Sequence, residues 1–151
     1  MQRETMAIVG FGDLGERLVA RLAPARWRCI GLRRNIAALP GAVKGMAVDF
    51  SKPASLQILS TLKPEVVVIA LTPAQRSAAG YRAGFADAMS AIINGLGGHR
   101  PRQAFFVSST RVYSESDGGW VDEDSPVASA DPFAGAILAA ESRLLDALPG
   151  A

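Results

Sequence analysis

Three glycines near the N-terminus have the spacing of a phosphate-binding turn. Gly10, Gly12 and Gly15 form a G-x-G-x-x-G pattern between an apolar run and a segment with leucines at helical spacing. The first glycine of such a turn permits a tight reversal, the second lets a pyrophosphate approach the backbone, and the third lets the helix pack closely. The following helix offers free N–H groups and a partial positive charge to phosphates. We therefore expect the turn to bind a dinucleotide through Gly10, Phe11, Gly12, Asp13, Leu14 and Gly15; the alternative is a glycine-rich turn that binds nothing.

The end of the second apolar run bears on which dinucleotide fits. A carboxylate at this place accepts hydrogen bonds from the ribose hydroxyls of NAD, whereas an arginine can pair with the 2′-phosphate of NADP. Here the run ends in Arg33 and Arg34, and no acidic residue occurs between Glu16 and Asp49. The sequence favours NADP over NAD; the alternative is that both arginines are solvated loop charges.

Strand and helix patterns alternate along the rest of the chain. Apolar runs predict strands at 6–9, 28–32, 43–48, 65–71 and 103–108. Helical patterns are found at 13–23, 53–62, 74–96 and 133–148, with Ser51 as an N-cap of the second helix and Gly95, Gly97 and Gly98 ending the third. Residues 110–131 form a long polar loop in this interpretation. The alternation predicts an α/β fold, a doubly wound parallel sheet of about five strands in a three-layer Rossmann arrangement.

Composition limits the possible classes of protein. The length of 151 residues fits one domain, 1–151. The net charge of +2 gives no sign of a nucleic-acid partner. The longest apolar run, 66–71, is far too short to span a bilayer, and the N-terminus lacks the pattern of a signal peptide. The single cysteine, Cys29, excludes an internal disulfide; we expect a buried thiol and a cytoplasmic location.

Later stretches carry a family resemblance. Residues 107–113 read Val-Ser-Ser-Thr-Arg-Val-Tyr, and 121–126 read Val-Asp-Glu-Asp-Ser-Pro. These look like the SSxxVY and xDExxP segments of the extended short-chain dehydrogenase/reductases, the NAD-dependent epimerase/dehydratase family. The other motifs of this chain follow one another in the same order as in this family, and the resemblance covers essentially the whole chain. The resemblance implies cofactor contacts from Asp49, at the adenine amino group, from Phe50 beside the ring, and from Ala70, Leu71 and Ser108. Asp49 could instead belong to the cap region of the next helix.

The chain departs from this family where the family transfers protons. Its members read P-Y-x-x-x-K-x-x-x-E, and the register from Pro132 to Glu141 places Phe133 at the tyrosine and Ile137 at the lysine. Neither side chain can transfer a proton. These features resemble the atypical, YeeZ-like branch of the family, which keeps the nucleotide site and lacks the Tyr/Lys pair. Ser109 and Tyr113 are the remaining candidates for a non-standard catalytic proton donor.

Three functional classes remain open from the sequence. One is an NAD(P)-binding protein without turnover, and another is an NADP-dependent oxidoreductase or epimerase-like enzyme that acts on an unknown small molecule. The third is a degenerate fragment that binds nothing tightly. The resembling family continues into a substrate-binding domain, which is absent here, so a natural short form, a truncated product and a fragment are all open. No metal site is expected, because the acidic positions between 115 and 124 read as a solvated loop.

The two long helical segments also predict an interface. Residues 74–96 and 133–148 are rich in small and apolar residues, and the apolar positions of the second, including Leu138 and Leu145, spread over more than one stripe. The resembling family pairs such helices in a four-helix bundle, so a homodimer is expected. The alternative is that the 110–131 loop or a missing C-terminal half covers this surface. Arg111, near the expected nicotinamide end, could meet an anionic substrate or be an ordinary surface arginine.

Overall fold

Five parallel strands form one sheet in the computed structural model, which describes residues 2–151. The strands are β1 (Glu4–Val9), β2 (Trp27–Arg33), β3 (Lys44–Ala47), β4 (Val66–Ile69) and β5 (Gln103–Phe106). Their spatial order is β3-β2-β1-β4-β5, so the direction of winding reverses between β1 and β4. This order confirms the predicted doubly wound α/β fold, and each predicted strand lies within two residues of the observed ends.

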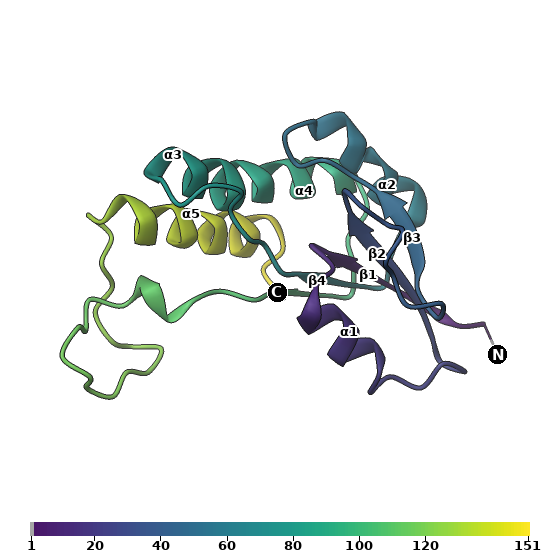
Figure 1. Cartoon of the computed structure of the whole chain (residues 1–151), viewed down its shortest axis with the longest axis horizontal. Helices are drawn as coiled ribbons and strands as arrows, with labels where there is room; N and C mark the ends of the chain where they lie inside the picture. Colours follow the sequence, from purple (N-terminus) through teal and green to yellow (C-terminus); the bar gives the residue numbers. More distant parts are fainter. Residues whose placement is uncertain (1) are drawn as a thin grey trace.

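Helices cover the two faces of the sheet unequally. One face carries α1 (Asp13–Val19) alone, and the other carries the remaining helices (Figure 1). These are the 3₁₀ turn η1 (Pro53–Gln57), α2 (Ile58–Leu62), α3 (Ala78–Tyr81), the π-helical segment η2 (Arg82–Asp87), α4 (Ala88–Leu96) and α5 (Pro132–Ala147). The arrangement is the expected three-layer one, with most of the buried apolar side chains between the sheet, α4 and α5.

The third predicted helix is wrong at its start and in its regularity. It begins at Ala78 rather than at Ala74, and Ser77 caps it by accepting a hydrogen bond from the N–H of Gly80 at 3.0 Å. The residues before it fold back along it instead of extending it. A Cβ on Gly84 would lie 2.7 Å from the Cα of Pro73, and one on Gly80 would lie 2.2 Å from the carbonyl oxygen of Gln75. Because of this close packing, the helix does not extend back to Ala74, as the periodicity alone would predict.

Two smaller predictions about helix ends are also wrong. The first helix ends at Val19, and the residues up to Ala23 form turns instead of a further helical turn. Ser51 caps no helix: η1 begins after Lys52 without a side-chain cap. The Ser51 hydroxyl instead donates to Asp49 Oδ1 at 2.7 Å, so both residues belong to a local turn that follows β3.

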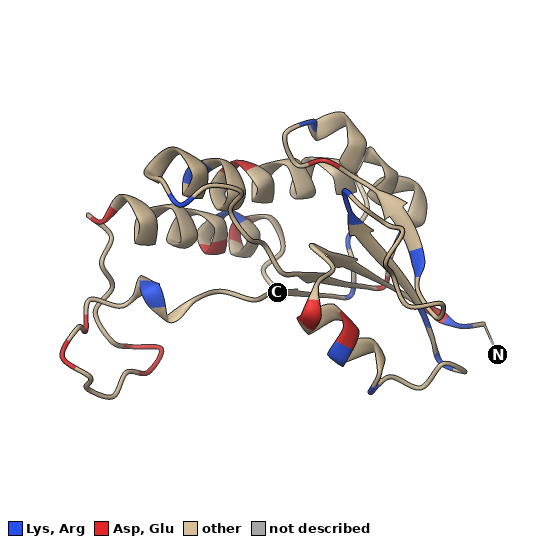
Figure 2. Ribbon diagram, viewed as in Figure 1, with Lys and Arg blue, Asp and Glu red and all other residues tan. Residues whose placement is uncertain are grey.

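The core agrees with the sequence patterns elsewhere. All four residues of β4 are buried, as a continuous apolar run in a parallel sheet predicts. Cys29 is buried as expected, and this burial raises the pKa of its thiol. The 110–131 loop holds the 3₁₀ turn η3 (Thr110–Val112) and is closed by an antiparallel bridge between Tyr113 and Val127. It projects from the body of the molecule with several acidic positions along it (Figure 2). Within residues 2–151, no helix has the length and apolar character needed to cross a membrane.

Candidate nucleotide-binding site

The turn between β1 and α1 passes very close to the end of β4. Gly10 has φ +82°, and a Cβ on it would lie 2.0 Å from the carbonyl oxygen of Ala70. Its N–H donates to the carbonyl of Leu32 at 2.9 Å, which also ties the turn to the end of β2. Only glycine combines this left-handed backbone conformation with so close a contact. The turn is therefore held at the carboxyl ends of three neighbouring strands.

The second and third glycines of the motif differ in what surrounds them. Gly12 precedes α1, and a Cβ built on it would find no atom within 4 Å. Gly15 is buried against the ring of Phe11, with its Cβ position 2.9 Å from that ring. Phe11 is itself buried in the apolar cluster between α1 and the sheet. Gly15 thus allows close packing of the helix, whereas Gly12 leaves the backbone open to a ligand.

A cavity of about 840 Å³ opens beside this turn. It lies at the carboxyl ends of the strands, next to the point where the strand order reverses, which is where doubly wound sheets bind ligands. The cofactor residues expected from the sequence that line it are Gly10, Phe11, Gly12, Arg33, Arg34, Asp49, Phe50 and Ala70. Asp13, Leu14, Gly15, Leu71 and Ser108 are not among the lining residues. Leu14 is 45% exposed, although its spacing predicted a place on the packed side of the helix.

The opposite wall of the cavity was not predicted. It is formed by residues of the segment before α3 and by the small residues of α3 and η2: Thr72, Ala74, Gln75, Ala79, Gly80, Ala83 and Gly84, with the carboxylate of Asp87. Alanines and glycines have no functional group that a sequence pattern could identify. The only signal is the spacing of Gly80 and Gly84 by one helical turn, which lets the preceding segment lie against the helix.

Charged groups gather at the β2–β3 end of the cavity. Arg33 is the last residue of β2 and Arg34 follows it, and Asp49 lies just after β3. The hydrogen bond that Asp49 accepts from the Ser51 side chain has the largest effect and lowers the pKa of Asp49. The hydrogen bond from the Ser51 backbone N–H and the nearby cations of Lys52 and Arg34 lower it further. Asp49 is therefore an ionised acceptor at neutral pH, next to two arginines that can pair with an anion.

Solved structures provide the comparison for this arrangement. A provisionally named NAD-dependent epimerase/dehydratase from Methylobacillus flagellatus is 30% identical, with a TM-score of 0.71 over 95% of this chain and 50% of that one. The chain has the fold of the NAD-dependent epimerase/dehydratases. An epimerase, also provisionally named, from Burkholderia cenocepacia is 22% identical, with a TM-score of 0.78 over 98% of this chain and 52% of that one.

The Bordetella bronchiseptica enzyme WbmG, solved in complex with NAD and UDP, has the same fold at 15% identity, with a TM-score of 0.78 over 95% of this chain and 50% of that one. The chain thus spans about half the length of these epimerase/dehydratase structures. No family model and no curated protein sequence matches it. The family resemblance read from the sequence is confirmed by the structural comparison.

Packed hydrocarbon side chains occupy the two positions that the sequence register assigned to the Tyr/Lys pair. Ile137, at the lysine position, is 1% exposed and belongs to the main core. Phe133, at the tyrosine position, packs edge-on against Tyr81 with ring centroids 4.9 Å apart. Neither side chain carries a group that could move a proton.

The predicted serine and tyrosine candidates are engaged in local structure. The Ser108 hydroxyl donates to Glu141 Oε1, and Ser109 Oγ accepts from the backbone N–H of Arg111 at 3.2 Å, which caps η3. Tyr113 is half-buried and forms the bridge that closes the 110–131 loop. The structure places these three residues after β5, outside the set that lines the large cavity.

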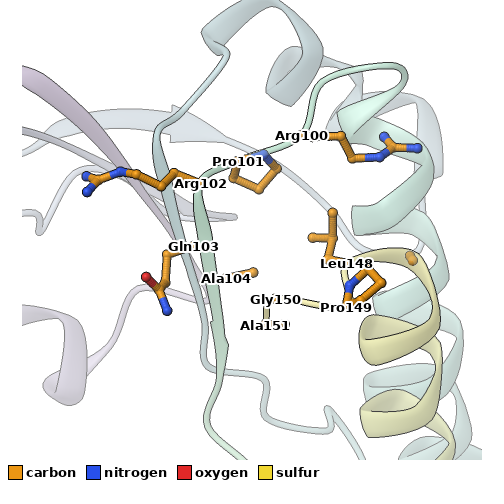
Figure 3. A pocket seen from close by; sticks show the side chains of 10 residues that line it. Arg100, Pro101, Arg102, Gln103, Ala104, Leu148, Pro149, Gly150 and Ala151 are labelled. Atoms are coloured by element: carbon orange, nitrogen blue, oxygen red, sulfur yellow. The ribbon is translucent and has the colours of Figure 1, made fainter.

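A second, smaller cavity of about 280 Å³ lies elsewhere on the sheet (Figure 3). It is formed by residues 100–104, around the start of β5, and by residues 147–151 after α5. This is the amino end of β5, away from the edge where ligands bind in this kind of fold. His99, close by in the sequence, is hydrogen-bonded through Nε2 to the carbonyl of Pro64 at 2.7 Å. Among residues 2–151, no cluster of His, Cys, Asp or Glu could hold a metal ion.

Proposed function

We propose that the chain binds a nicotinamide dinucleotide in the 840 Å³ cavity and does so without turning over a substrate. The observation that carries the proposal is that one cavity joins the open backbone at Gly12 to Asp49 and to the two arginines at the end of β2. A pyrophosphate fits the glycine turn, and the adenosine half fits between Asp49, Phe50 and the arginines. The similar Bordetella bronchiseptica enzyme was solved with NAD and UDP, which supports a dinucleotide ligand of this class.

The proposed contacts follow the carboxyl edge of the sheet. The pyrophosphate lies along the turn of Gly10, Phe11, Gly12, Asp13, Leu14 and Gly15, and the nicotinamide half extends towards Ala70, Leu71 and Ser108. Residues 1–151 form one such binding domain in this proposal. The absence of turnover is supported by Phe133 and Ile137, which leave the proton-transfer positions without a donor. An oxidoreductase or epimerase-like reaction would have to use Ser109 or Tyr113 instead.

NADP is proposed as the preferred cofactor because of Arg33. A charge-assisted contact to the 2′-phosphate contributes on the order of 1.5–3 kcal/mol. Arg33→Ala should therefore weaken NADPH binding roughly tenfold or more and leave NADH binding nearly unchanged. Isothermal titration calorimetry with both cofactors measures the two losses. Arg21→Ala is the matched control, because Arg21 is an exposed arginine that follows α1 and lies outside the cavity. Equal losses for NADPH and NADH in Arg33→Ala would contradict the assignment.

A homodimer through the helices of the α4–α5 layer is also proposed. On α5, Ile137 and Leu144 are buried in the core, whereas Leu145 is 52% exposed and Leu138 is half-buried. Apolar surface left over after the core is covered is typical of an interface. Light scattering at micromolar concentration should give twice the monomer mass of 15.8 kDa. Leu145→Glu should restore the monomer and Leu14→Glu, on the opposite face of the sheet, should not. A constant monomer mass across a concentration series would refute the dimer.

A further inference from the structure

Three side chains from three different elements meet beyond the end of β5. The guanidinium carbon of Arg111, in η3, lies 4.6 Å from the centre of the Phe133 ring on α5 and 5.7 Å from that of the Tyr81 ring on α3. The two rings contact each other edge-on. A cation held against two aromatic rings keeps its position better than an arginine that extends freely into solvent. The Arg111 side chain nevertheless remains 47% exposed.

The Arg111 side chain forms one long ion pair and donates no hydrogen bond within residues 2–151. Stacking on a ring occupies the face of a guanidinium group, whereas its five N–H donors lie in the plane of the group. Its one ion pair within residues 2–151 is with Asp131, and the 3.7 Å between Arg111 Nη2 and Asp131 Oδ2 is too long for a hydrogen bond. Asp131 is already engaged as the N-cap of α5, accepting from the N–H of Ala134 at 3.1 Å. A fixed fork of donors is therefore free to bind an anion.

Arg26 shows that stacking alone does not produce this arrangement. Its guanidinium also lies over a ring, that of Trp27, at 5.1 Å. However, its Nε donates to Glu4 Oε1 at 3.1 Å, so part of its donor fork is satisfied within the protein. Arg26 and Arg111 thus form a natural pair for comparison, because both lie over aromatic rings but only Arg26 donates a hydrogen bond to an acid.

We propose that Arg111 is a binding residue for an oxyanion, a carboxylate or a phosphate group, of a small-molecule ligand. Phe133 and Tyr81 are positioning residues that hold the guanidinium plane, so that two parallel N–H groups can pair with two ligand oxygens. The location of this anion site relative to the cofactor rests on the proposed function, because Phe133 is where the resembling family has its proton-transferring tyrosine, next to the nicotinamide end of the cofactor. A fixed positive charge replaces a proton donor there, so the site selects an anionic ligand rather than acting as an acid.

The test uses the full chain and the side-chain Nε–Hε signals of its arginines in ¹⁵N NMR spectra. Sodium malonate and, in a separate titration, inorganic phosphate serve as probes of carboxylate and phosphate binding, with and without NADPH. The Arg111 signal should shift saturably with at least one probe while the Arg26 signal stays in place. Arg111→Lys, which keeps the charge without the fork, should weaken the response roughly tenfold. Phe133→Leu, which keeps an apolar side chain without the ring, should weaken it several-fold, and the backbone spectrum reports whether each variant folds.

The possible outcomes separate this inference from the cofactor proposal. Saturation with malonate alone or phosphate alone supports the inference and identifies the anion. No saturable shift at Arg111, an equal shift at Arg26, or an unchanged response in folded Phe133→Leu would each overturn it. Because the titration of the free chain needs no cofactor, a chain that fails to bind NADPH but still shows the Arg111 response would contradict only the dinucleotide proposal.

Discussion

A Gly12→Val variant is expected to fold like the parent chain and to bind NADPH about a hundredfold more weakly, or not measurably. We expect a valine to be accommodated here, because no protein atom lies within 4 Å of a Cβ at this position and the backbone is extended, with φ −134°. The same open space is where the pyrophosphate is proposed to lie. Losing one or two hydrogen bonds to a charged group costs on the order of 3 kcal/mol, which corresponds to the expected hundredfold.

The experiment combines NADPH calorimetry with thermal unfolding followed by circular dichroism. Gly41→Val is the matched control, because Gly41 is equally open and lies outside the cavity. It should bind NADPH as the parent does. Parental NADPH affinity in a folded Gly12→Val variant would show that the pyrophosphate does not approach the backbone at this turn, and the placement of the cofactor would be wrong.

The sheet could be predicted from the sequence because its residues are subject to local rules. A parallel strand covered on both faces must be apolar throughout, and β4 follows this rule at all four positions. The left-handed backbone at Gly10 is equally local, since φ +82° favours glycine over every other residue. Such features leave a mark in the sequence regardless of what the distant parts of the chain do.

The remaining parts of the site depend on contacts between distant segments. Periodicity extended the third helix back to Ala74, and it could not show that Gly84 packs against Pro73 and so turns the preceding segment back. For the same reason the wall of alanines and glycines opposite the glycine turn was missed. The contact of Arg111 with Tyr81 and Phe133 joins three elements that no local pattern connects. The sequence shows these three residues, but it does not show that they are in contact.

Gly95 is a further case, because the sequence assigned it to the end of a helix. In the structure it lies inside α4, and the chain turns only at Gly97, which has φ +57°. Gly95 is buried where α4 crosses η1. A Cβ there would lie 2.4 Å from the carbonyl oxygen of Leu56 and 2.8 Å from its carbonyl carbon. The residue is therefore required by the closeness of two backbones, and not by a turn.

Gly95→Ala should lower the free energy of unfolding by about 1–2 kcal/mol, as measured by urea denaturation. Two effects oppose each other: alanine inside a helix is favoured over glycine by about 1 kcal/mol, whereas overpacking a core costs roughly 1–3 kcal/mol. We expect the second to be larger here, because the obstacle is backbone of a fully buried residue and cannot move aside like a flexible side chain. Gly98→Ala, with open space around its Cβ position, should change stability by no more than about 0.5 kcal/mol. If Gly95→Ala is as stable as the parent, α4 and η1 do not cross as closely as described.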